Sequence, residues 1–287
     1  MKTNTFKLRE RPVVFGREWL PEGETRGVVA LVHGLGEHSG RYAHLANALT
    51  KVGFAVTALD LRGHGKTEGK RGDWPSYETQ LDDIALMLKR AKNLYESKPL
   101  FLYGHSLGGN LVINYALRRP TDKLQGVIAS GPWLRLPTPP PTIKVLAAKL
   151  MALFAPSLTQ PNGLQPAYLS RRPDVAKAYV EDPLVHDRIS LRLFLQAHKA
   201  AQWAIEHAAE LNIPMLLMHG GDDHLTSPEA SREFCERAGQ NCTFRLWEGM
   251  YHEIHNETDR EAVYQAIIEW LEEQMPDGYP QAGLETH

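Results

Sequence analysis

The pentapeptide Gly104-His105-Ser106-Leu107-Gly108 is the stretch of this 287-residue chain whose residue types most directly suggest chemistry. It has the pattern G-x-S-x-G, follows an apolar run at 100–103 and precedes a helical pattern at 111–117. A serine on a sharp turn between a strand and a helix presents its hydroxyl at the top of a sheet. The two glycines suit such a turn because a Cβ at either position would clash. The pattern therefore predicts that Ser106 is a nucleophile.

A histidine late in the chain is the expected base, because a serine hydroxyl is a poor nucleophile at neutral pH unless a base takes its proton. His252 lies in a predicted loop just past the apolar run at 244–247 and before the last helical pattern. This position places it at the carboxyl edge of the sheet. We therefore prefer His252 and keep His255 as the alternative.

Two adjacent carboxylates, Asp222 and Asp223, follow the apolar run at 215–218 and are candidates for the acid that orients the histidine. Such an acid stabilises the cationic form of the imidazole. At most one of the two adjacent side chains can face His252, and both stay open on these grounds. The order serine, aspartate, histidine along the chain is that of the triad in α/β-hydrolases.

Backbone N–H groups near Ser106 should hold the negative oxygen that forms when a serine attacks an acyl carbon. The N–H of Leu107, the residue after the nucleophile, is the first candidate. The second should come from the loop after an earlier strand, and His33-Gly34-Leu35-Gly36 supplies that loop. Its glycines let the backbone approach a substrate closely, so the N–H of Leu35 is the predicted second donor.

Short, nearly continuous apolar runs alternate with helical patterns and predict the scaffold that positions these residues. Such runs indicate strands buried on both faces, as in a parallel sheet. They lie at 28–32, 54–59, 100–103, 127–129, 215–218 and 244–247. The helical patterns lie at 77–95, 111–117, 227–238 and 263–271. The alternation predicts right-handed crossovers and a mostly parallel, doubly wound sheet of the α/β class.

The stretch 132–211 breaks the alternation, since it opens with a proline cluster and carries helical patterns but no convincing strand. An insertion of this kind covers the carboxyl edge of an open α/β sheet, where ligands bind. We therefore predict a core at 1–131 and 212–275, a helical cap (lid) at 132–211 and a flexible tail at 276–287. Within the cap, the segment 143–154 is apolar nearly all round.

The composition fits a soluble globular protein, because 43% hydrophobic and 23% charged residues exclude wholesale disorder. A formal net charge of −2 gives no electrostatic reason to expect a nucleic acid as a partner. We find no secretory signal and no apolar run long enough to span a membrane, and we expect a cytoplasmic protein. Cys235 and Cys242 are interpreted as reduced thiols, although the sequence leaves open whether they pair.

Six segments together resemble the monoacylglycerol lipase and lysophospholipase family of α/β-hydrolases, in register from about 27 to 271. They are the oxyanion loop at 33–42, a D-x-R-G-x-G loop at 60–65, the serine turn at 104–109, a cap motif at 182–186, the acid loop at 220–225 and the histidine loop at 251–257. The family's acid loop has a hydrophobic residue two positions after the acid. Leu225 fits this spacing and selects Asp223. Leu107 stands where methionine is common, a departure that leaves its N–H intact.

The resemblance implies a serine ester hydrolase that acts on lipids with one fatty acyl chain and needs no metal or cofactor. Apolar cap residues would line a tunnel for the chain; the alternative for the segment 143–154 is core packing. Such a cap would also contact membrane surfaces peripherally, which Lys144 and Lys149 suit. The residues that correspond to the family's polar groups near the glycerol head group are Glu37, Arg41, Tyr179 and His255.

Other interpretations of the same residues stay open. Lysophospholipids, short esters or peptides are alternative substrates, because proteins labelled serine aminopeptidases share these motifs. A ligand-binding protein without activity is the alternative from another class, although a binder does not need an intact triad. A dinucleotide fingerprint lacks its third glycine at Ser39, and His252-Glu253-Ile254-His255 is one residue too short for the zinc motif H-E-x-x-H. The sequence does not fix chain-length preference or oligomeric state.

Overall fold

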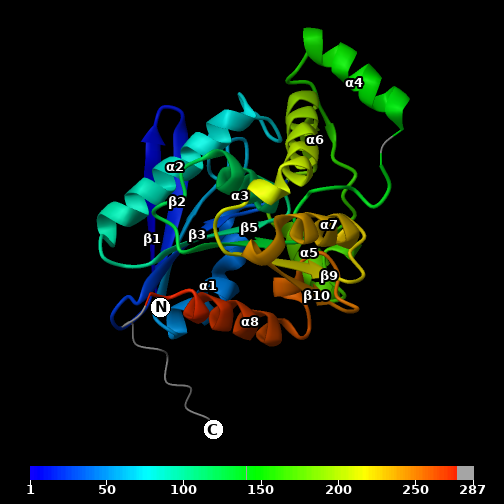
Figure 1. Ribbon diagram of the computed structural model, residues 1–287. Helices are drawn as coiled ribbons and strands as arrows, with labels where there is room; N and C mark the ends of the chain where they lie inside the picture. The colour runs from blue at the N-terminus through cyan, green and yellow to red at the C-terminus, as the bar shows by residue number, and fades with distance from the viewer. Residues whose placement is uncertain (140, 277–287) are drawn as a thin grey trace.

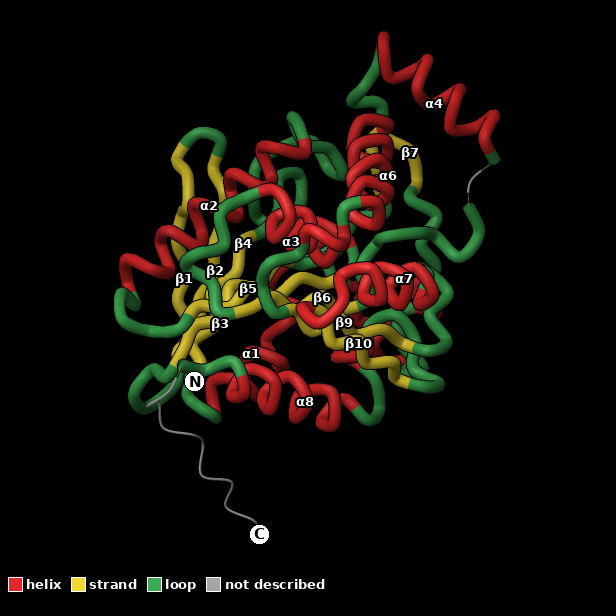
Figure 2. Tube along the Cα trace, in the orientation of Figure 1, coloured by secondary structure: helices red, strands yellow, loops and turns green. Residues whose placement is uncertain are grey.

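An eight-stranded sheet forms the centre of the protein in a computed structural model, which describes residues 1–139 and 141–276 (Figures 1 and 2). The strands are β1 (Lys2–Glu10), β2 (Val13–Leu20), β3 (Gly27–Val32), β4 (Phe54–Leu59), β5 (Leu100–His105), β6 (Gly126–Ser130), β9 (Met215–Gly220) and β10 (Cys242–Trp247). Their order across the sheet is β1-β2-β4-β3-β5-β6-β9-β10. All pairings from β4 to β10 are parallel, and those of β1 with β2 and β2 with β4 are antiparallel. The predicted mostly parallel sheet is confirmed.

Six of these strands coincide with the predicted apolar runs, whereas the hairpin of β1 and β2 was missed. β1 lies at the edge of the sheet, and its residues are exposed or only half-buried. Its sequence therefore carries polar residues where a central strand carries a continuous apolar run. The hairpin extends the sheet on the side away from β9 and β10, so it takes no part in the site described below.

Helices cover both faces of the sheet, as expected for a doubly wound fold. Those outside the segment 132–211 are α1 (Ala43–Lys51), α2 (Tyr77–Leu94), α3 (Leu107–Arg118), α7 (Pro228–Ala238) and α8 (Arg260–Glu273). Residues 28, 30 and 32 of β3 contribute to a core with α2, α3 and α7, and residues 29 and 31 to a second core with α1 and α8. Figure 1 shows α1 and α8 below the sheet and α2 and α3 above it. The two-residue period of a strand thus feeds two separate cores.

The segment between β6 and β9, called here the inserted segment (132–211), adds three α-helices and a small second sheet among its described residues. The helices are α4 (Thr142–Phe154), α5 (Pro173–Glu181) and α6 (Leu191–Glu206), and the strands are β7 (Thr159–Pro161) and β8 (Arg188–Ser190). β7 and β8 pair antiparallel, so the expectation of no strand here was wrong. Three-residue strands are too short to give a recognisable alternation in the sequence. In Figure 1, α4 projects beyond α6, away from the sheet.

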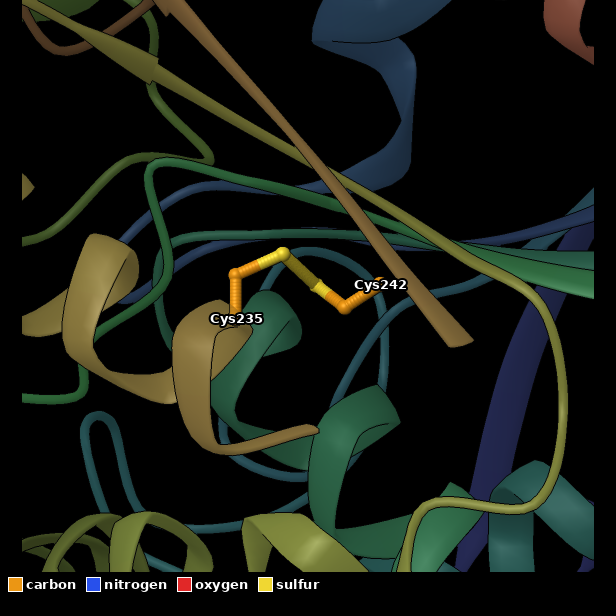
Figure 3. The surroundings of a disulfide bond; sticks show 2 residues. All are labelled: Cys235 and Cys242. Atoms are coloured by element: carbon orange, nitrogen blue, oxygen red, sulfur yellow. A yellow bond between two sulfur atoms is a disulfide. The ribbon is translucent and has the colours of Figure 1, made fainter. Parts of the chain in front are cut away.

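Cys235 and Cys242 form a disulfide, which corrects the interpretation of these residues as reduced thiols (Figure 3). Cys235 lies in the last turns of α7, and Cys242 is the first residue of β10. The chain reverses between these elements in the short helix η4 (Gly239–Asn241), which brings the two Cα atoms to 5.2 Å from each other. That separation is typical of a disulfide.

Two further expectations concern the end of the chain and membrane spans. Apart from Pro276, the predicted flexible tail at 276–287 lies outside the described residues. Within the described ranges, no helix combines the length and the apolar character that crossing a bilayer requires.

Candidate active site

Ser106 occupies the sharp turn between β5, which ends at His105, and α3, which begins at Leu107. Its φ is +54°, and it is the one residue other than glycine with a positive φ among those described. The turn is as crowded as the G-x-S-x-G pattern predicts. A Cβ on Gly104 would collide with the carbonyl oxygen of Gly108, and a Cβ on Gly108 would collide with that of Val32. Such strain in a residue with a side chain is characteristic of functional sites.

His252 and Asp223 form a buried pair at the same edge of the sheet. Nδ1 of His252 lies 2.7 Å from Oδ2 of Asp223. Because a carboxylate only accepts hydrogen bonds, Nδ1 donates, and Nε2 of the neutral ring has a free lone pair. Asp222 is exposed, and His255 is buried against Tyr42, with ring centroids 4.9 Å apart. The geometry therefore pairs His252 with Asp223 rather than the two alternatives.

The surroundings of this pair shift the pKa values of both of its members. Burial lowers the pKa of a histidine, but the charge of Asp223 and the hydrogen bond to it outweigh burial, so that the pKa of His252 is raised. Burial raises the pKa of Asp223, but His252 and His219 together hold it well below its ordinary range. Asp223 is thus ionised at neutral pH, and His252 is a stronger base than an isolated imidazole.

The loop that follows β3 passes directly beside Ser106. A Cβ on Gly34 would come within 3.2 Å of Cβ of Ser106, so only glycine allows this approach without a shift. Leu35 lines a cavity together with Ser106 and His252. Leu107 is the first residue of α3, and the N–H groups of a first turn have no acceptor within the helix. Both predicted oxyanion donors therefore belong to backbone segments next to Ser106.

A buried ionic network holds this loop in place. Glu37 accepts hydrogen bonds from the N–H of Gly34 at 2.7 Å, from the hydroxyl of Tyr42 at 2.6 Å and from Arg41 at 2.5 Å. Arg41 also donates to both carboxylate oxygens of Glu253 at 2.6 and 2.8 Å. Glu253 is the residue after His252, so the network ties the oxyanion loop to the histidine loop.

The four residues predicted near the substrate head group lie apart from the described cavity around Ser106, whose lining includes none of them. The charged groups of Glu37 and Arg41 bind within the network. His255 stacks on Tyr42 and packs against His105. Tyr179 lines a neighbouring cavity of about 290 Å³, and its hydroxyl would lie 3.1 Å from a Cβ on Gly36. Their contact with substrate stays a prediction.

The cavity around Ser106 and His252 has a volume of about 350 Å³, and the inserted segment supplies most of its walls. Its apolar lining residues are Leu35, Trp133, Leu136, Pro137, Pro161, Leu164, Ile189, Phe194 and Leu225. Polar groups come from Thr138, Gln160, Asn162, His224 and Thr226. Within residues 1–139 and 141–276, no group of three or more His, Cys, Asp or Glu side chains is arranged to hold a metal ion. A cavity of this kind suits a ligand with an apolar chain.

The apolar side chains of helix α4 neither line the cavity around Ser106 nor pack in the core. None of its residues is buried, and none lines the cavity around Ser106. Ile143 is 70% exposed, Leu153 74% and Phe154 90%. A helix shows the same apolar pattern in its sequence whether or not another element covers it. The sequence therefore does not indicate that α4 is exposed.

Three features define the α/β-hydrolase class. They are a doubly wound, mostly parallel sheet, a strained serine between a strand and the following helix, and an aspartate–histidine pair after later strands. Comparison with known proteins agrees, because the profile of the family described as "Serine aminopeptidase, S33" matches residues 23–259. The chain belongs to this family. A crystal structure of Paleococcus ferrophilus monoacylglycerol lipase is 41% identical, with a TM-score of 0.83 over 91% of this chain and 99% of that one.

Curated relatives named as a lipase and a phospholipase are also similar to this chain. The monoacylglycerol lipase of Mycolicibacterium smegmatis is 32% identical over 88% of this chain and 90% of its own length, and phospholipase YtpA of Bacillus subtilis is 33% identical over 83% and 92%. An uncharacterised abhydrolase domain-containing protein of Dictyostelium discoideum, 36% identical over 90% of this chain, is longer, and the match spans 28% of it. The predicted family and the predicted class of enzyme, an ester hydrolase, are confirmed.

Proposed function

We propose that this protein cleaves the ester bond of monoacylglycerols to a fatty acid and glycerol, with Ser106, His252 and Asp223 as its triad. The observation that carries the proposal is the buried His252–Asp223 hydrogen bond of 2.7 Å beside an apolar cavity that Ser106 also lines. The relatives named monoacylglycerol lipase support the substrate. A lysophospholipid is the second candidate, which the Bacillus subtilis phospholipase favours.

The reaction follows from the placement of the three side chains. Nε2 of His252 takes the proton of Ser106 while the hydroxyl oxygen attacks the ester carbon. The N–H groups of Leu35 and Leu107 hold the negative oxygen. The tetrahedral intermediate collapses, the bond to glycerol breaks, and glycerol leaves with the proton from His252. A water molecule then gives a proton to His252 and attacks the acyl carbon. The bond from that carbon to the Ser106 oxygen breaks, His252 returns the proton to this oxygen, and the fatty acid leaves.

The inserted segment acts as the cap in this proposal. Its apolar side chains around the cavity receive the single acyl chain, and each buried CH₂ contributes about 0.8 kcal/mol to binding. The apolar lining of this cavity suits a single acyl chain, and we therefore expect monoacyl substrates to be preferred over di- and triacylglycerols. Glu37, Arg41, Tyr179 and His255 remain the candidates for contact with the head group, and Glu37 and Arg41 also hold the oxyanion loop through the ionic network.

We also infer that α4 contacts a lipid surface. Its exposed apolar side chains form a continuous face with no partner in the described chain, and Lys144 and Lys149 add positive charge to the same helix. A helix that combines an apolar face with lysines binds at the interface of a membrane. Contact through α4 would place the cap where monoacylglycerols partition. The disulfide between Cys235 and Cys242 weighs against the predicted cytoplasmic location, because thiols stay reduced in that compartment.

Labelling with a fluorophosphonate probe and a panel of substrates tests the proposed activity. We expect the wild type to be labelled and to hydrolyse monoacylglycerols faster than di- and triacylglycerols, a lysophospholipid or an aminoacyl amide. Ser106→Ala should abolish labelling and turnover. Ser97→Ala is the matched control, because Ser97 is exposed and precedes β5 at the opposite edge of the sheet from Ser106.

Three results would contradict the proposal in different ways. Labelling or ester hydrolysis by Ser106→Ala would remove Ser106 from the mechanism. Faster cleavage of the lysophospholipid or the amide would keep the triad and replace the substrate. A wild-type protein that is neither labelled nor active on any member of the panel would be a binder with this fold.

A further inference from the structure

A second histidine, His219, contacts the carboxylate that pairs with His252. It lies near the end of β9, two residues before Gly221, and is completely buried. Its Nε2 atom is 3.0 Å from Oδ2 of Asp223, the same oxygen that accepts the hydrogen bond from His252. Neither the G-x-S-x-G turn nor the spacing of the triad assigns a role to this residue.

The two hydrogen-bond neighbours of His219 determine which of its ring nitrogens carries the hydrogen. Because the carboxylate of Asp223 only accepts, Nε2 of His219 must carry a proton and donate it. On the other side of the ring, Nδ1 lies 2.8 Å from the hydroxyl oxygen of Ser231 on α7. In neutral His219 this nitrogen accepts the hydroxyl proton of Ser231. The chain of donors therefore runs from Ser231 through His219 to Asp223.

Other contacts hold the remaining acceptor positions of Asp223. Oδ1 accepts from the N–H groups of Leu225 at 2.7 Å and Thr226 at 3.0 Å. The hydroxyl of Thr226 lies 2.9 Å from Oδ2, but it also lies 3.1 Å from the carbonyl oxygen of Gly131 and has only one proton to donate. His219 and His252 are thus the two ring N–H groups that share Oδ2.

We propose that His219, oriented by Ser231, is a positioning residue that holds Oδ2 of Asp223 in place for His252. The proposal rests on the triad assigned above. His219 does not contact the cavity around Ser106, and it acts only through Asp223. It fixes the carboxylate from the side of β9 and α7, while His252 approaches from the loop after β10.

The same contact limits how strongly Asp223 acts on His252. A carboxylate oxygen that accepts a second hydrogen bond has less negative charge available for the first. Loss of the His219 donor should therefore raise the pKa of His252, so that the base is protonated at a higher pH. The other titratable or charged groups that act on His252 are His105, Glu253, Glu37 and His255. None of these is changed by a substitution at position 219.

The test compares three variants by their pH profiles on a water-soluble ester. His219→Phe keeps a ring of similar volume and removes the donor. We expect kcat to fall about tenfold, and the acid limb of kcat/KM to move up by about one pH unit, as for loss of one hydrogen bond to an ionised group. His219→Gln keeps both a donor and an acceptor and should return the limb to its wild-type position. Ser231→Ala should shift it in the same direction by less.

The outcomes separate this proposal from the proposed function. A wild type that shows no Ser106-dependent labelling would contradict the function itself. A wild type that labels normally, with an acid limb unmoved by His219→Phe, would overturn only the role of His219. If His219→Phe does not fold, Ser231→Ala decides, since an unmoved limb in that variant would overturn the same role. A His219→Gln profile shifted as far as that of His219→Phe would also overturn it, because the ring rather than its N–H would then matter.

Discussion

The loops at the carboxyl edge of the sheet and the helix α4 of the inserted segment differ in how their side chains are satisfied. In the loops, Arg41 binds two buried carboxylates at 2.5–2.8 Å, and Asp223 accepts hydrogen bonds on both oxygens. On α4, by contrast, no residue is buried, and Leu153 and Phe154 are largely exposed to water. One region has partners for its buried charges, whereas the other leaves its largest apolar side chains exposed among the described residues.

Under the proposed function, this difference separates two requirements of an enzyme that hydrolyses lipids. Proton transfer needs groups that are held within a fraction of an ångström, which paired charges and buried hydrogen bonds provide. Uptake of a lipid needs apolar surface that remains available until the lipid arrives. A substitution in the loops should therefore change catalysis or folding. A substitution on α4 should change only the interaction with a lipid phase.

The largest effect is expected at Asp223. Asp223→Asn should lower kcat by roughly 10⁴-fold, because an amide cannot hold His252 in the tautomer that accepts a proton at Nε2. Asp222→Asn is the matched control, since Asp222 is adjacent but exposed, and it should leave kcat close to that of the wild type. Steady-state kinetics on a soluble ester measure both. Comparable losses in the two variants would contradict the choice of Asp223.

Breaking the ionic network should come next and should appear mainly as lost stability. Arg41→Met leaves the buried carboxylates of Glu37 and Glu253 without their cation, which should cost about 3–5 kcal/mol of unfolding free energy. Arg172→Met removes an ion pair with the exposed Asp174 and should cost less than about 1 kcal/mol. Denaturant unfolding compares the two. Equal losses would mean that the network contributes no more than a surface ion pair.

The sequence predicted those parts of the molecule whose pattern is local. Central strands are buried on both faces, so each appears as a continuous apolar run. The turn at Ser106 appears as two glycines at fixed spacing, because tight backbone contact excludes a Cβ there. The edge strand β1 has no such pattern, and it was missed for that reason.

Contacts between distant residues could not be predicted in the same way. Arg41 and Glu253 are 212 positions apart, and nothing in either segment alone indicates that they form an ion pair. The role of His219 depends on Ser231, on a helix that packs beside β9. The pairing of Cys235 with Cys242 depends on how η4 reverses the chain. The family's spacing selected Asp223 over Asp222, whereas no pattern in the sequence shows that α4 is exposed.

Helix α4 should determine binding to lipid vesicles. Replacing Leu153 and Phe154 together by serine should weaken partitioning into anionic vesicles by about tenfold for each residue, given the apolar area removed. Leu94→Ser is the control, because Leu94 is also exposed but lies at the end of α2. Vesicle sedimentation measures the bound fraction, and thermal unfolding should be unchanged. Equal binding by the double variant and the wild type would exclude α4 as the contact.

The smallest effect concerns the pH at which activity appears. In the proposed mechanism His252 must be neutral to take the proton of Ser106. The pKa of His252 is raised from the ordinary value of 6.5, because the charge and hydrogen bond of Asp223 outweigh burial. The acid limb of kcat/KM should therefore lie above pH 6.5, with activity falling about tenfold for each pH unit below it. Unfolding measured at the same pH values separates loss of the base from loss of the fold. A limb below 6.5 in folded protein would mean that burial, rather than the paired carboxylate, sets the basicity of His252.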